Sequence, residues 1–193
     1  MDTEPFRTLY SSNVFYLGHS APSPGATGSD ALIQPLRNAY PAHASDEIEG
    51  INAWLTIYPS GIQLQLVGSR RPIVYWFPIQ NLYITAAMKC VNFLNPGGQV
   101  ERSTFIRLTE PEASKSSQGP LFTFICKLNR GDDLQCYTFL TKNDETALNL
   151  VDTLKNAFTN KAGHSERTIP DKVSLISLDA LYVPRHETRP LTL

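Results

Sequence analysis

The side chains that could carry out catalysis are scattered through this chain. Its four histidines, His19, His43, His164 and His186, fall in loops and near the termini. None of them shares a recognisable motif with a serine, a cysteine or a pair of carboxylates, as nucleophilic and general acid–base catalysis would require. Glycine-rich phosphate loops and metal-ligand spacings are also missing from the sequence. We therefore expect no enzymatic activity, no metal and no cofactor, with an enzyme of unrecognised type as the alternative.

The three cysteines, Cys90, Cys126 and Cys136, predict no covalent framework. They are odd in number and lack C-x-x-C spacing, so the sequence supports neither a disulfide scaffold nor a zinc site. If the hairpin predicted around Gly131 is symmetric about that residue, Cys126 and Cys136 lie across from each other. We expect both to be reduced, small apolar residues, with a redox pair as the less favoured alternative.

Composition and charge exclude several classes of protein. The chain has 193 residues, of which 41% are hydrophobic and 18% charged, and its formal net charge is −1. This length suits one ordinary domain with a real core plus some extra chain. The near-zero charge balance gives no footprint for nucleic acid. Because no apolar run approaches about 18 residues and no signal-peptide pattern is present, we expect a cytoplasmic protein without a transmembrane segment.

The clearest structural signal lies in Pro120–Asn160. Two runs rich in aromatic and β-branched residues, Pro120–Leu128 and Leu134–Leu140, flank a short link centred on Gly131. This pattern predicts a β-hairpin, because glycine supplies the positive φ of a tight return. After the hairpin the apolar period changes to about 3.6 residues, which predicts an amphipathic helix that begins near Asn143 and lies on a sheet.

The remaining elements are predicted from shorter patterns. Strands are expected at Asn13–Gly18, Ala53–Tyr58, Ile62–Leu66, Ile73–Phe77 and Leu82–Ala87, and a short helix at Ala31–Tyr40. Residues 1–12 are expected to form an N-terminal arm, 13–160 the domain, and 161–193 a polar tail. In that tail the apolar cluster Val173–Leu178, which continues through Tyr182-Val183, could be an added strand or a tail that docks elsewhere. Residues 90–119 are expected to be a long loop insertion, in which Thr104–Leu108 could form a short strand.

This order of elements resembles the pleckstrin-homology superfold, an α+β architecture. Antiparallel strands joined by short turns need two sheets packed face to face, and a helix must cover the open end. The expected fold is therefore two packed antiparallel sheets, with seven strands in all, capped by the C-terminal amphipathic helix.

Within that superfold the chain resembles the phosphotyrosine-binding family, also called the PTB or PID domain, over roughly Asn13–Asn160. Several short motifs carry the resemblance, and their order and spacing match together. They are Tyr16-Leu17-Gly18, Ser60-Gly61-Ile62-Gln63-Leu64, Phe77-Pro78-Ile79-Gln80-Asn81-Leu82-Tyr83-Ile84, Phe122-Thr123-Phe124-Ile125-Cys126, Gln135-Cys136-Tyr137-Thr138-Phe139 and Ala157-Phe158.

The resemblance implies a signalling adaptor that binds a short Asn-Pro-x-Tyr-like peptide in a receptor tail or signalling protein. Such domains add the peptide as a strand to the edge of their fifth strand, against the last helix. The matching positions here are Leu82, Tyr83, Ile84, Thr85, Ala86, Ala87 and Met88 on the strand, and Leu150, Val151, Leu154 and Phe158 on the helix. Phe158 could instead be an ordinary core residue.

Selectivity for phosphotyrosine requires arginine or lysine side chains that converge on the phosphate. Where phosphate-dependent members of the family carry an arginine, this chain has Leu134 or Gln135, so the resemblance favours phosphate-independent recognition. The alternative is a phosphoinositide-binding module of the same superfold, recruited to the membrane surface. The candidate contacts for a phosphate or lipid headgroup are Arg70, Arg71, Lys89 and Arg130.

Overall fold

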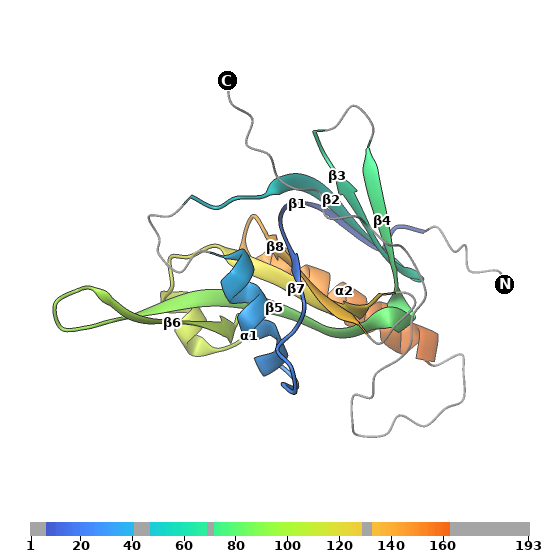
Figure 1. Ribbon diagram of the computed structural model, residues 1–193. Helices are drawn as coiled ribbons and strands as arrows, with labels where there is room; N and C mark the ends of the chain where they lie inside the picture. Colours follow the sequence, from blue (N-terminus) through green and yellow to red (C-terminus); the bar gives the residue numbers. More distant parts are fainter. Residues whose placement is uncertain (1–6, 41–46, 69–71, 129–132, 163–193) are drawn as a thin grey trace.

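The computed structural model describes residues 7–40, 47–68, 72–128 and 133–162. Within these ranges the chain is an α+β protein with antiparallel strands and a long C-terminal helix, as expected, and its strands form one large sheet (Figure 1). The expectations for Arg70, Arg71 and Arg130, and for the tail beyond residue 162, concern residues outside the described ranges.

Eight strands form the sheet, in the order β4-β3-β2-β1-β8-β7-β5-β6. Their bounds are β1 Tyr10–Ser20, β2 Ile51–Tyr58, β3 Gly61–Leu66, β4 Ile73–Pro78, β5 Leu82–Leu94, β6 Val100–Arg107, β7 Pro120–Lys127 and β8 Leu134–Leu140. The helices are α1 Asp30–Ala39 and α2 Asp144–Ala162, with short 3₁₀ turns η1 Ile79–Asn81 and η2 Pro111–Lys115. Neither α-helix in the described ranges has the length and apolar character needed to cross a membrane.

The sheet bends over on itself. Although four other strands separate β4 from β7 in the sheet order, the Phe77 ring of β4 lies 5.1 Å from the Phe124 ring of β7. The same ring lies 4.7 Å from Tyr137 of β8. Figure 1 shows β2, β3 and β4 folded across the strands that include β7 and β8, with α2 beside them. Buried α2 residues, among them Leu150 and Leu154, complete this core.

The strand count differs from the expected seven, and hydrogen bonds join all strands in one sheet rather than two. The additional strand is β6, which pairs with Met88–Leu94 of β5 inside the segment 90–119 that was expected to be a loop. At the hairpin turn, the Asn95 Oδ1 atom accepts hydrogen bonds from the backbone N–H groups of Gly97 and Gln99. Phe105 is the one buried residue of β6, so the strand lacks the alternation of buried apolar residues that marks a half-buried strand. Only its second half was indicated by the sequence, within the possible strand Thr104–Leu108.

The cysteine geometry corrects one expectation. The β7–β8 register places Ile125 opposite Cys136 and Cys126 opposite Gln135, one residue away from symmetry about Gly131. A shift of one residue turns the side chains to opposite faces of the sheet, so Cys126 and Cys136 pack in different cores. Burial raises the pKa of the Cys136 thiol to about 11 and also raises the pKa of Cys126. Both thiols are therefore protonated at neutral pH.

Helix α2 begins where the sequence predicts. The Asn143 side chain caps its first turn by accepting a hydrogen bond from the Thr146 backbone N–H at 2.8 Å. On the other face of the sheet, α1 buries Leu32 and Leu36 against residues that include Phe105 and Ile125. The two helices therefore cover opposite faces of the sheet.

Both ends of the predicted domain extend further than expected. Strand β1 begins at Tyr10, inside the predicted arm, because Tyr10 pairs with Ile57 of β2. Helix α2 continues to Ala162, beyond the predicted end at Asn160.

Candidate functional site

Strand β5 changes its neighbours along its length. One side of Leu82–Lys89 pairs with β7, with an irregularity between Leu82 and Ile84. On the other side only Met88–Leu94 pairs with β6, and the Leu108 N–H donates to the Ala87 carbonyl at 2.9 Å. No strand within the described ranges pairs with the outer side of Leu82–Ala86. This first half of β5 therefore presents an open sheet edge.

Thr85 is the central backbone position of this edge. The Ala87 carbonyl points outward, because it accepts the hydrogen bond from Leu108. Backbone groups in a strand repeat their direction every two residues, so the N–H and C=O of Thr85 point outward as well. Neither group is hydrogen-bonded by any residue that the structure describes. They are the donor and acceptor that an added strand would use.

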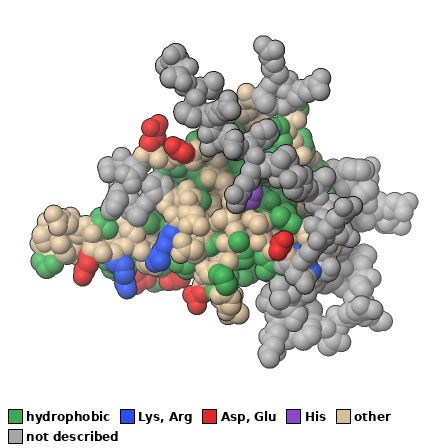
Figure 2. All heavy atoms as spheres, viewed as in Figure 1, with side chains coloured by type: hydrophobic (Ala, Val, Ile, Leu, Met, Phe, Trp, Pro, Cys, Tyr) green, Lys and Arg blue, Asp and Glu red, His purple; other side chains and the backbone are tan. Residues whose placement is uncertain are grey.

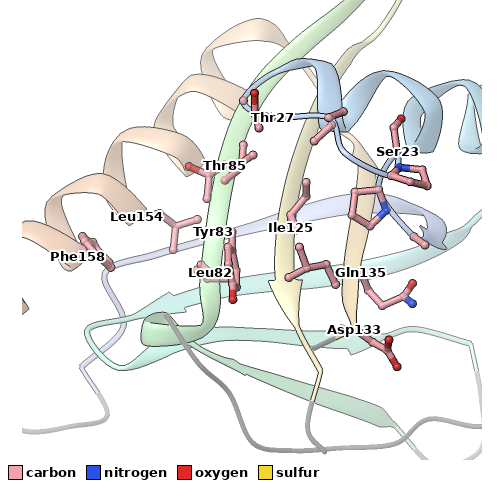
Figure 3. A pocket seen from close by; sticks show the side chains of 18 of the residues that line it. Ser23, Thr27, Leu82, Tyr83, Thr85, Ile125, Asp133, Gln135, Leu154 and Phe158 are labelled. Atoms are coloured by element: carbon pink, nitrogen blue, oxygen red, sulfur yellow. The ribbon is translucent and has the colours of Figure 1, made fainter. Parts of the chain in front are cut away.

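Helix α2 forms one wall beside the edge. Leu154 and Phe158 of α2 both line the space beside the edge, and Figure 3 shows Phe158 level with Leu82. Leu154 is only 2% exposed, whereas the Phe158 side chain is 40% exposed. Phe158 is therefore an accessible aromatic at the edge, while Leu154 also supports the core. Leu150 and Val151, predicted for the same wall, are buried in the core and do not line it.

A second wall lies on the opposite side of β5. It consists of the segment 21–28 between β1 and α1, above Ile125 of β7 and Gln135 of β8 (Figure 3). Arg107 holds this segment close to the end of β6, because its Nε and Nη2 atoms donate to the Ser29 Oγ atom at 3.0 and 2.6 Å. The Ser29 hydroxyl therefore contacts Arg107 and does not cap α1, for which no side-chain cap is formed.

The open edge and its two walls enclose a groove of about 1060 Å³, which we call the β5 groove. Four predicted strand residues and two predicted helix residues line it: Leu82, Tyr83, Ile84, Thr85, Leu154 and Phe158. The side chains of Ala86, Ala87 and Met88, also predicted for the site, are buried in the two cores. Successive side chains of β5 point to opposite faces of the sheet, so Ala87 enters one core and Ala86 and Met88 enter the other.

Sequence reasoning missed the second wall. The segment 21–28 shows only the proline, glycine and serine content of a generic loop, and Arg107 lies in Thr104–Leu108, which was expected as a possible short strand but not as part of the site. β1 pairs with β8, and β6 pairs with β5. These long-range pairings bring the segment 21–28 and Arg107 to the β5 edge, and the sequence carries no local signal for them.

Charge is sparse in the groove. The charged residues that line it within the described ranges are Arg107, Asp133 and Lys155. Both cations already have partners, since Arg107 donates to the Ser29 hydroxyl and the Lys155 Nζ atom lies 3.5 Å from the Asp152 carboxylate. Leu134 and Gln135 line the groove with neutral side chains. Figure 2 likewise shows only separated Lys and Arg side chains on the face that it displays, outside the grey residues. The described part of the groove is therefore suited to a largely apolar, uncharged ligand.

Lys89 is not available as the phosphate or lipid contact for which it was a candidate. It is only 7% exposed, and its Nζ atom lies 3.1 and 3.2 Å from the two carboxylate oxygens of Asp144. The Lys89 side chain points from the face of β5 toward the first turn of α2, where it pairs with Asp144. The other three candidates, Arg70, Arg71 and Arg130, lie outside the described residues.

The described residues that line the groove include no histidine or cysteine. No group of three His, Cys, Asp or Glu side chains in the described ranges is placed to hold a metal ion. The features that the groove does offer are an open strand edge, an exposed aromatic ring and apolar walls. These features suit the binding of an extended peptide.

No family model matched this chain, and no curated protein matched it either.

Proposed function

We propose that this protein is a peptide-binding adaptor of the phosphotyrosine-binding type, within the pleckstrin-homology superfold. It takes a short Asn-Pro-x-Tyr-like segment of a receptor tail or signalling protein as an added strand on β5. The observation that carries the proposal is the open edge of Leu82–Ala86 beside the exposed ring of Phe158. In strand addition, main-chain hydrogen bonds supply affinity and side pockets supply selectivity.

The bent sheet supports the choice of superfold. Strands β2–β4 share one core with β5, β7 and β8, as the two packed sheets of the superfold would. Helix α2 completes that core and reaches the groove with its last two turns. The added strand would extend the order β1-β8-β7-β5 by one position.

The two walls define what the ligand must carry. Successive side chains of a strand point to opposite faces, so alternate ligand residues would meet α2 and the segment 21–28. Both sides offer mainly apolar contacts, including Leu154 and Phe158 on one and Ile125 on the other. The ligand therefore needs apolar residues on both of its faces, over a length limited by the hydrogen bond between Leu108 and Ala87.

Recognition is proposed to be independent of phosphate. The two cations of the described groove, Arg107 and Lys155, already pair with Ser29 and Asp152, and the Asp133 carboxylate at its β8 end would repel a phosphate. The alternative, phosphoinositide binding, would require Lys89 to contact the headgroup, but the Lys89 ammonium is paired with Asp144. We therefore favour a cytoplasmic peptide adaptor over a lipid-binding module.

A backbone-amide NMR titration tests the proposal. The full chain is titrated with one Asn-Pro-x-Tyr peptide in unphosphorylated and phosphorylated forms, with a scrambled peptide as the control. We expect shifts at Thr85 and Phe158 with both forms, at affinities that differ by less than about threefold, which corresponds to less than about 1 kcal/mol. Binding of the phosphorylated form alone would contradict phosphate independence. No shifts with either form, together with binding to phosphoinositide vesicles, would favour the lipid function.

A further inference from the structure

The chain leaves the described fold beside the β5 groove. Phe158 and Thr159, in the last turns of α2, both line the groove, and the helix ends at Ala162. The sequence then continues to Leu193. Any segment that follows α2 therefore starts next to a site that can accept an extended chain.

One segment of this continuation has the pattern that the groove requires. Val173–Leu178 reads Val-Ser-Leu-Ile-Ser-Leu and is the longest run after α2 without charge or proline. In an extended conformation, Val173 and Leu175 point to one side while Ile176 and Leu178 point to the other. Apolar residues thus occur on both faces, which matches a groove with apolar walls on both sides of β5.

The connecting chain is long enough for an antiparallel arrangement. Figure 3 shows Phe158 level with Leu82, at the start of β5, so an antiparallel segment must enter from the other end of the open edge. An extended strand as long as Leu82–Ala87 measures roughly 20 Å. The ten residues Gly163–Lys172 can reach up to roughly 33 Å. The connection can therefore pass along the edge, and Val173–Leu178 can return beside it.

We infer that Val173–Leu178 binds in the β5 groove of its own chain as an added antiparallel strand, and that an outside peptide must displace it. The inference rests on the proposed function in one respect, since both need the β5 edge to accept a strand. A short tether gives an effective concentration on the order of millimolar, so even weak intrinsic binding would keep the groove largely occupied. Occupancy of nine-tenths would lower the apparent affinity for an outside peptide about tenfold.

Hydrogen exchange in the full chain, without added peptide, tests this inference directly. The readout is the Thr85 amide, for which the described residues provide no hydrogen-bond acceptor. The test variant is Leu175→Asp with Ile176→Asp, and the matched control is Leu191→Asp with Leu193→Asp. The Ile125 amide of β7, which should be unchanged in all three chains, reports on an intact fold.

We expect slow exchange at Thr85 in the native chain and in the control, and exchange at least about tenfold faster in the test variant. A single exchange rate at Thr85 in all three chains, whether fast or slow, would overturn the inference.

Titration of the native chain and the test variant with the Asn-Pro-x-Tyr peptide separates the two proposals. Tighter binding by the test variant, by about tenfold, is expected if both hold. Equal affinities together with unchanged exchange at Thr85 would remove the internal ligand and leave the peptide-binding function. Faster exchange in the variant without peptide binding to either chain would remove that function and leave the internal ligand.

Discussion

The two halves of β5 share one backbone but have different surroundings. Met88–Leu94 lies beside β6 and buries Met88 and Cys90, whereas Leu82–Ala86 has β7 on one side and a groove on the other. The difference arises because the β5–β6 hairpin covers only the second half. Whether a part of β5 is paired on both sides or has an open edge thus depends on where its neighbour β6 ends.

The surroundings of the open half also explain how such an edge can be tolerated. Unpaired sheet edges tend to associate with other sheets, and proteins usually cover or interrupt them. Here α2 and the segment 21–28 stand on either side of the edge. Walls on both sides of an open edge hinder the approach of a second sheet. In the proposed function the same walls would select the ligand.

Blocking the open edge should have the largest effect on binding. Thr85→Pro removes an outward N–H and places a proline ring at the edge, so we expect no measurable affinity for the Asn-Pro-x-Tyr peptide by NMR titration. Thr85→Ala keeps the N–H and should bind like the native chain. Normal binding by a folded Thr85→Pro protein would show that the ligand binds elsewhere.

Two neighbouring α2 residues should separate stability from binding. Leu154→Ala removes a side chain that is 2% exposed and should lower the free energy of unfolding by about 2–5 kcal/mol in urea denaturation. Phe158→Ala removes a ring that is 40% exposed, so it should change stability little and weaken peptide binding by about 1–3 kcal/mol. Undiminished affinity in the Phe158 variant would mean that this ring is not part of the binding site.

The covered half of β5 should respond through stability alone, and by the smallest amount. Asp144→Ala leaves the Lys89 ammonium buried without its partner, and we expect a loss of about 1–2 kcal/mol in the free energy of unfolding because Asp144 is itself half exposed. Asp152→Ala is the matched control, since Asp152 pairs with Lys155 at 3.5 Å on the surface and should cost less than about 0.5 kcal/mol. Equal losses in the two variants would remove the structural role of Lys89.

Local patterns were sufficient to predict most elements of the fold. The alternation in Ile62–Leu66 and the 3.6-residue period from Ala147 to Ala157 correspond to a strand and a helix whose apolar faces are buried. Asn143 caps α2 as predicted, because a cap depends on residues within one turn. Six of the residues proposed for the site from the sequence also line the β5 groove, and their role in binding stays a prediction.

The tertiary structure alone decided which of these elements meet. Which half of β5 remains open depends on the extent of β6, of which the sequence indicated only the second half, within Thr104–Leu108. The ion pair of Lys89 joins residues 55 positions apart, and the separation of Cys126 from Cys136 depends on a one-residue difference in the β7–β8 register. The sequence by itself determined the elements, because their signals are local. Long-range packing decided which elements pair and in which register. It thereby also decided the extent of the β5 groove.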